Sequence, residues 1–141
     1  GRSIDRAHRM RRVSSSVTIE ARIDEVWPYV SQFKWWPEWG VSVIEVDSDV
    51  DRIAPGVMGR VRTPVGLWLP FEIDEVSEES FWSWSVAGIP ATNHHIESQT
   101  NGTLVQFTAP WIVAPYSVVM TSSLARLKRL AENPRHFSDP G

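Results

Sequence analysis

The stretch VSSSVTIEARIDEVWPYVSQFKWWPEW, residues 13–39, changes its hydrophobic period in the middle, and this change decides the fold. Residues 13–21 alternate apolar and polar side chains, and their β-branched residues favour a half-buried strand. Over residues 23–33 the apolar side chains recur every three or four positions, which predicts a short amphipathic helix. Pro37 interrupts the chain again, so KWWPEW predicts at most one or two turns of a second helix.

The middle of the chain reads as strand after strand. Short turns rich in Gly, Pro and Asn separate the strands, including Gly88 to Pro90 and the strong hairpin signal Asn101-Gly102. Six strands joined by such short turns predict an antiparallel meander. The predicted strands are VSVIEVDSD, GVMGRVRTP, LWLPFEIDEVS, SFWSWSVAG, NHHIESQ and TLVQFTAPW.

A long helix with an apolar stripe follows, from about Tyr116 to Glu132. The predicted fold class is therefore α+β: a curved antiparallel seven-stranded sheet around a C-terminal helix, with two short helices between strands 1 and 2. One helix about 10 Å wide cannot fill the concave face of a strongly bent sheet. We therefore expect a cavity between sheet and helix, and such cavities hold apolar ligands.

Charge is unevenly distributed along the chain. Residues 1–12 carry five arginines against Asp5, which leaves −7 on the rest of a chain whose net charge is −3. We expect a flexible basic arm over 1–12, one domain over 13–132 and a loose tail over 133–141. An acidic body predicts no nucleic-acid partner, because nucleic-acid affinity depends on neutralising phosphates.

The composition excludes several classes of protein. The chain has no cysteine, so it has no disulfide, thiolate metal site or cysteine nucleophile. It has neither an apolar run long enough to cross a bilayer nor a signal-peptide core, and we expect a soluble cytoplasmic protein with no membrane insertion. No cofactor is expected. Both a monomer and a homodimer remain open.

The opening stretch resembles that of the START-like superfamily, also called SRPBCC, and within it the polyketide cyclase/dehydrase-like group. The residues that carry the resemblance are Ile19, Ala21, Val26, Trp27, Trp36, Pro37 and Trp39. The Pro55-Gly56 turn, the histidine of NHHIE, the Gly102-Thr103 turn and the terminal helix also lie where the family has them, so the resemblance covers about residues 13–132. Arg22 replaces the family's usual proline, and Gln32 a frequent aspartate. The resemblance implies a helix-grip fold, in which the tryptophans wall one end of the cavity and Trp39 is the one best placed to face a ligand.

Strand alternation predicts which side chains face the cavity, because successive residues of a strand point to opposite faces. On NHHIES the apolar anchor Ile96 puts His94 inward and His95 outward. The predicted ligand-binding residues are Trp39, Val61, Phe71, Trp84, His94, Ile96, Phe107, Tyr116, Met120 and Leu124.

His94 and Tyr116 are the candidates for chemistry. A histidine in an apolar cavity can act as a hydrogen-bonding handle or as a general acid or base, because its pKa lies near neutrality. The alternative is a histidine satisfied by a neighbouring hydroxyl or carbonyl. Tyr116 offers a second polar tip. No metal site is expected, since adjacent His94 and His95 point to opposite faces and the alternating carboxylates of residues 47–51 lack an EF-hand pattern.

Three functions follow from these observations. The leading hypothesis is the binding of a small hydrophobic, aromatic or polycyclic, ligand. The second, implied by the resemblance, is a polyketide cyclase/aromatase-type enzyme in which His94 shuttles protons. The third is a protein-binding module that uses the tryptophans as an interface. The shortage of inward polar residues beyond His94 and Tyr116 favours binding over catalysis.

Overall fold

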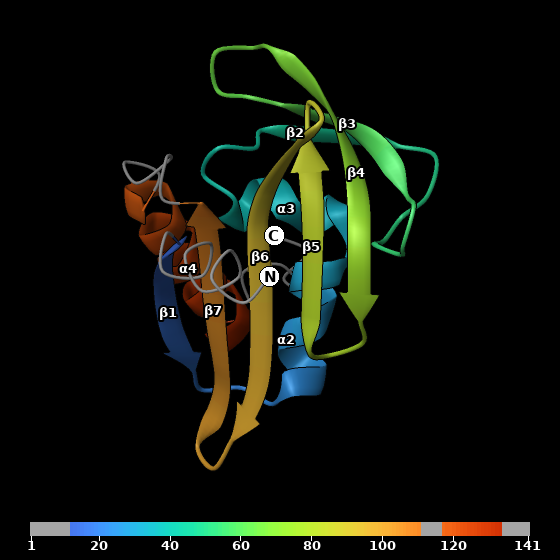
Figure 1. Cartoon of the computed structure of the whole chain (residues 1–141). Coiled ribbons are helices and arrows are strands. Elements are labelled where there is room, and N and C mark those ends of the chain that lie inside the picture. Colours follow the sequence, from blue (N-terminus) through green and yellow to red (C-terminus); the bar gives the residue numbers. More distant parts are fainter. Residues whose placement is uncertain (1–11, 111–116, 134–141) are drawn as a thin grey trace, which may run out of the picture.

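The computed structural model describes residues 12–110 and 117–133. In this part of the chain, seven antiparallel strands form one curved sheet in the order β1-β7-β6-β5-β4-β3-β2 (Figure 1). The strands are β1 Arg12–Ile19, β2 Glu45–Ser48, β3 Met58–Arg62, β4 Trp68–Ser77, β5 Phe81–Val86, β6 Ile89–Gln99 and β7 Gly102–Pro110. The predicted fold class is confirmed.

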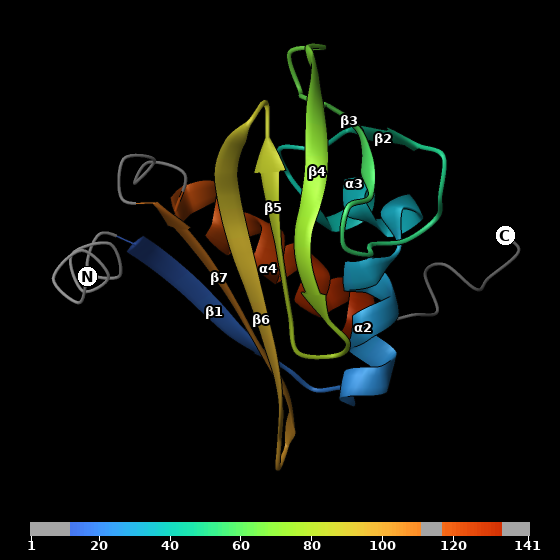
Figure 2. The ribbon, with the colours of Figure 1, turned by 45° about the vertical axis from the view of Figure 1, so that its right-hand side comes forward.

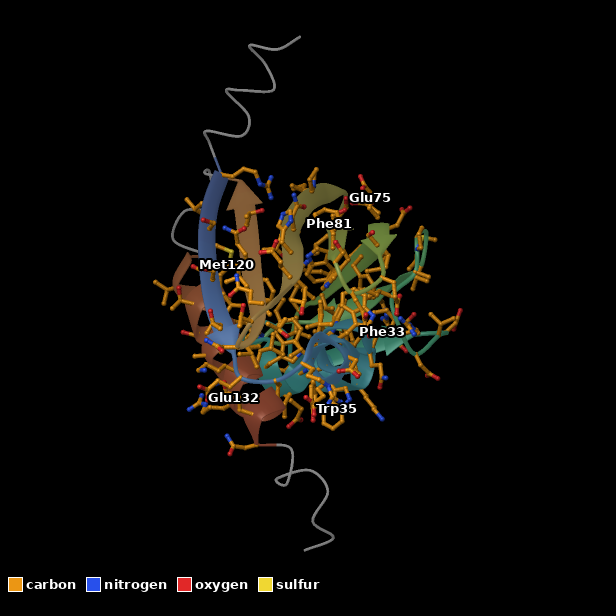
Figure 3. All side chains as sticks on the ribbon, turned by 90° about the horizontal axis from the view of Figure 1, so that it is seen from below. Phe33, Trp35, Glu75, Phe81, Met120 and Glu132 are labelled. Carbon is orange, nitrogen blue, oxygen red and sulfur yellow. The ribbon has the colours of Figure 1, made fainter. Side chains whose placement is uncertain are left out.

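The helices lie on one side of this sheet. Helix α2 (Ile23–Ser31), the short 3-10 helix η1 (Phe33–Trp35) and α3 (Trp36–Trp39) connect β1 to β2, and α4 (Ser117–Glu132) follows β7. Figure 2 shows α4 crossing behind β5, β6 and β7. In Figure 3 the sheet arches over α2 and α4, and Phe81 and Glu75 lie on its other side. Tyr116, predicted to start the long helix, lies outside the described residues.

Two indole groups complete the C-terminal end of α2. The last four carbonyls of a helix have no partner within the helix. In α2 the Trp39 Nε1–H donates to the Tyr29 carbonyl at 2.8 Å, and the Trp36 Nε1–H donates to the Val30 carbonyl at 2.9 Å. The backbone N–H groups of Gln32 and Ile53 donate to the other two, those of Pro28 and Ser31. The tryptophan-rich segment is therefore folded back against the helix that precedes it.

Both faces of the sheet follow the predicted alternation. Trp82 and Trp84 are buried, whereas Phe81, the first residue of β5, is only half-buried. On β6, His94 and Ile96 are buried and His95 is exposed. The predicted strand register is confirmed at these positions.

The turns differ from the prediction in one place. Residues Gly88 to Pro90 were expected to be a turn, but β6 begins at Ile89 and the turn consists of Ala87 and Gly88. Both turn residues have positive φ, 54° and 78°. This is the backbone of a two-residue hairpin, whose twist matches that of the flanking strands, so the strand can resume at once.

The first and the last described residues, Arg12 and Asn133, both make hydrogen bonds to the folded domain. The sequence prediction had assigned them to the arm and the tail. Arg12 is the first residue of β1, and its guanidinium donates to Thr108 Oγ1 and to the Thr108 carbonyl, both at 3.2 Å. The Asn133 N–H donates to the Arg129 carbonyl at the end of α4. None of the helices in the described ranges has the length and apolar character needed to cross a lipid bilayer.

Candidate ligand site

A small pocket lies where α3, α4 and the concave face of the sheet meet. Its volume is about 40 Å³, which is room for about two or three water molecules. The segment around α3 contributes Trp36, Trp39, Gly40, Ser42 and Val43; the sheet contributes Trp82, Trp84, Thr92, His94 and Phe107; and α4 contributes Val119, Met120 and Ser123.

The structure brings together half of the residues predicted to bind a ligand. Trp39, Trp84, His94, Phe107 and Met120 line the pocket, and Figure 3 shows Met120 between α4 and the sheet. The others that the structure describes are buried in the core without lining this pocket: Val61, Phe71, Ile96 and Leu124. Tyr116 lies outside the described residues.

A chain of hydrogen bonds holds His94 in the pocket wall. Its Nδ1 lies 3.1 Å from the Trp82 carbonyl oxygen, which can only accept, so Nδ1 carries the proton. Nε2 is then an acceptor, and the Thr92 hydroxyl donates to it at 2.9 Å. The Thr92 oxygen in turn accepts from the Trp84 indole N–H at 2.9 Å. Both ring nitrogens of His94 are therefore engaged by the protein.

Burial keeps this histidine neutral. Desolvation lowers the pKa of His94 to about 3, against the smaller opposing effect of the hydrogen bond to Trp82. The imidazole also lies against the Trp82 indole, which stacks in turn on Trp36 with ring centroids 5.1 Å apart and an interplanar angle of 14°. His94 thus forms the end of a row of three flat rings. Phe107 contacts it edge-on, with ring centroids 4.7 Å apart.

One hydrogen bond beside the pocket joins α4 to the turn after α3. The backbone N–H of Val41, in the turn after α3, donates to Ser123 Oγ of α4 at 3.1 Å. Ser123 is buried, so this bond links α4 to the turn without help from solvent.

Several pocket residues were not predicted from the sequence. Thr92 could have been found, because it lies two positions before His94 and therefore on the same face of β6. Trp82 and Trp36 were not among the predicted ligand-binding residues, although both line the pocket. Ser123 gives no signal of its own, because a serine within an amphipathic helix is usually solvated.

Within residues 12–110 and 117–133, no cluster of three or more His, Asp or Glu side chains could hold a metal ion. His94 and His95 occupy opposite faces of β6, as the alternation predicted.

Several solved structures share this fold. MLL2253 from Mesorhizobium loti aligns with a TM-score of 0.73 at 14% sequence identity, covering 87% of this chain and 98% of its own. The Aha1 dimer from Colwellia psychrerythraea aligns with a TM-score of 0.69 at 16% identity, over 86% of this chain and 96% of its own. DynU16, a protein in the dynemicin biosynthetic locus, has a TM-score of 0.69 at 19% identity over 88% of this chain, which spans 48% of DynU16. At such identities the likeness shows the fold alone.

No curated protein sequence matches the chain. The profile of the family described as "Polyketide cyclase / dehydrase and lipid transport" matches residues 10–132. Since this match covers most of the chain, the chain belongs to that family.

Proposed function

We propose that this protein binds a small hydrophobic, aromatic or polycyclic, molecule in the pocket between α3, α4 and the sheet. The family and the fold suggest either ligand binding or a cyclase reaction. One observation favours binding: the pocket wall contains four tryptophans and a phenylalanine, and its one histidine has both ring nitrogens bonded to protein groups. Flat aromatic walls offer a flat ligand large contact area and favourable ring stacking.

The same observation is unfavourable to catalysis by His94. A general acid or base works best when its pKa lies near the operating pH and when it can reach the substrate's proton. The pKa of His94 lies near 3 because the ring is buried, and Nε2, its only acceptor nitrogen, is occupied by Thr92. A proton shuttle would require this hydrogen-bond chain to break in every turnover.

The burial of Trp36 and Trp39 is unfavourable to a partner-binding module that would use them as its interface. Trp36 is 2% exposed and Trp39 is 5% exposed, so neither offers aromatic surface to a partner. Their indole N–H groups are also used inside the protein, at the end of α2.

A polycyclic ligand is larger than the 40 Å³ pocket, so its entry requires the walls to move apart. The Val41–Ser123 hydrogen bond is the contact that has to stretch or break for α4 to leave the turn after α3. Met120, on the same face of α4, has an unbranched and adaptable side chain that can yield to a ligand. The association rate is therefore expected to lie below the diffusion limit, and binding is expected to separate α4 from α3.

The uncharged dye N-phenyl-1-naphthylamine tests this proposal, because its fluorescence rises in apolar surroundings. Titration should show saturable binding to the wild-type protein. Met120→Trp should weaken binding at least about 10-fold, because the larger side chain occupies the space that the ligand needs. The matched control is Val118→Trp, on the same helix at a position 69% exposed, which should bind as the wild type does. Equal binding by both variants would place the dye elsewhere.

A further inference from the structure

The wall of the pocket carries no formal charge. Among its lining residues in the described part of the chain there is no Lys, Arg, Asp or Glu, and its histidine is neutral. A charged group buried without a counter-charge is strongly disfavoured. This pocket therefore suits an uncharged ligand.

The hydroxyl groups of Thr92 and Ser123 differ in whether the hydroxyl proton already has an acceptor in the protein. The Thr92 hydroxyl has no unused proton, because its oxygen accepts from the Trp84 indole N–H and its proton is donated to His94 Nε2. Ser123 is different: its oxygen accepts from the Val41 N–H, and among the described residues no acceptor receives its hydroxyl proton. A buried hydroxyl proton without an acceptor is a donor available to a ligand.

Trp82 also has a hydrogen-bond donor without a partner in the described part of the chain. The indole N–H of Trp82, another pocket residue, is buried and has no hydrogen-bond partner among the described residues. An indole N–H can donate but cannot accept. The unused hydrogen-bonding capacity of Ser123 and Trp82 is therefore donor capacity, which a ligand can satisfy only with an acceptor atom.

We propose that the pocket selects uncharged, flat molecules bearing a carbonyl oxygen, and that Ser123 is the residue that recognises this oxygen. This inference rests on the proposed function and adds the chemical class of the ligand. The bound oxygen accepts the Ser123 hydroxyl proton, and this bond can form even when entry of the ligand stretches the Val41–Ser123 hydrogen bond, because that bond uses the oxygen of Ser123 and not its proton. Hydrocarbons of the same shape lack this bond, and carboxylates enter only with an uncompensated charge.

Fluorenone and fluorene test the role of Ser123, because they share one flat three-ring framework and differ in the carbonyl. Their affinities are measured by displacement of N-phenyl-1-naphthylamine. In the wild type the ratio of the two affinities should favour fluorenone, and in Ser123→Ala this ratio should fall about 5-fold, the usual effect of one neutral hydrogen bond. Using the ratio cancels any general change that the variant makes to the pocket.

Two further variants keep the test decisive. Ser122→Ala makes the same substitution one position away on α4, outside the pocket lining, and should keep the wild-type ratio. Ser123→Cys preserves the shape of serine with a weak donor, and should lower the ratio even if Ser123→Ala fails to fold. An unchanged ratio in the folded Ser123 variants would overturn the role of Ser123 while leaving ligand binding intact.

The charge rule has its own probe. The 8-sulfonate of N-phenyl-1-naphthylamine has the framework of the neutral dye and one negative charge. At the site from which fluorenone displaces the neutral dye, the sulfonate should bind about 100-fold more weakly or worse. Comparable affinity at that site would overturn the preference for uncharged ligands. If neither the neutral dye nor fluorenone binds at all, both the proposed function and this inference are wrong.

Discussion

The His94 imidazole lies flat against the Trp82 indole, with ring centroids 3.7 Å apart and an angle of 11° between the planes. The same histidine donates from Nδ1 to the backbone carbonyl of Trp82. Two neighbouring strands are thus joined by one residue pair through both a ring contact and a hydrogen bond. This double connection indicates that His94 stabilises the pocket wall.

Replacing His94 should therefore lower stability first. His94→Ala removes the stacked ring and leaves both the Trp82 carbonyl and the Thr92 hydroxyl without their partner, so we expect a loss of about 3 kcal/mol in the free energy of unfolding. Urea denaturation measures this loss. His95→Ala is the control, because its ring lies on the exposed face of β6, and it should cost less than about 1 kcal/mol. Similar losses in the two variants would contradict the structural role of His94.

Stability should also depend on pH through His94. The pKa of His94 is lowered to about 3 by burial, from an ordinary value of 6.5. Below pH 6.5 the His94 imidazole is therefore protonated in the unfolded chain but stays neutral in the native protein. Stability is complete above about pH 6.5 and should fall as the pH decreases towards 3, by about 1.4 kcal/mol per pH unit from this group.

Unfolding experiments between pH 6.5 and 5 isolate this effect, because most carboxylates titrate below that range. Burial also lowers the pKa of His95, so its contribution has the same sign and needs its own variant. His94→Gln should remove most of the slope, and His95→Gln should retain most of it. A full slope in His94→Gln would show that another group carries the pH dependence.

Position 102 should accept no residue larger than glycine. Gly102 has a φ of 147°, and a Cβ added there would overlap the Ile19 carbonyl of β1. Gly102→Ala should therefore destabilise the protein by about 3 kcal/mol or more, through strain and overpacking together. Gly88 also has a positive φ, but an added Cβ there meets nothing within 4 Å, so Gly88→Ala should cost only about 1 kcal/mol in the same urea experiment. Equal costs would mean that the close approach to Ile19 is absent.

The sequence predicted the fold well because the fold depends on local periods. Alternation placed His94 inside and His95 outside without knowledge of their neighbours, and the same reasoning would have found Thr92. The size of the pocket could not be predicted in this way. It depends on how Trp36 packs onto Trp82 in the middle of the sheet. The segment that carries Trp36 folds back against the end of α2, so this contact joins segments far apart in the chain.

The tryptophans of residues 33–40 show the same limit. The family resemblance implied that they wall the cavity, and Trp36 and Trp39 do line the pocket. Their second role, donating to the carbonyls of Tyr29 and Val30, follows from the angle at which the chain turns back after Gln32. No pattern of residue types specifies that angle.

The indole N–H signals of a ¹⁵N-labelled sample report directly on where a ligand binds. Trp36, Trp39, Trp82 and Trp84 line the pocket, whereas Trp27, Trp35 and Trp68 do not. Addition of N-phenyl-1-naphthylamine should shift the indole signals of Trp36, Trp39, Trp82 and Trp84 and leave those of Trp27, Trp35 and Trp68 nearly unchanged, with assignments from Trp→Phe variants. Binding in the pocket would be contradicted if the signals of Trp27, Trp35 or Trp68 moved while those of Trp82 and Trp84 stayed in place.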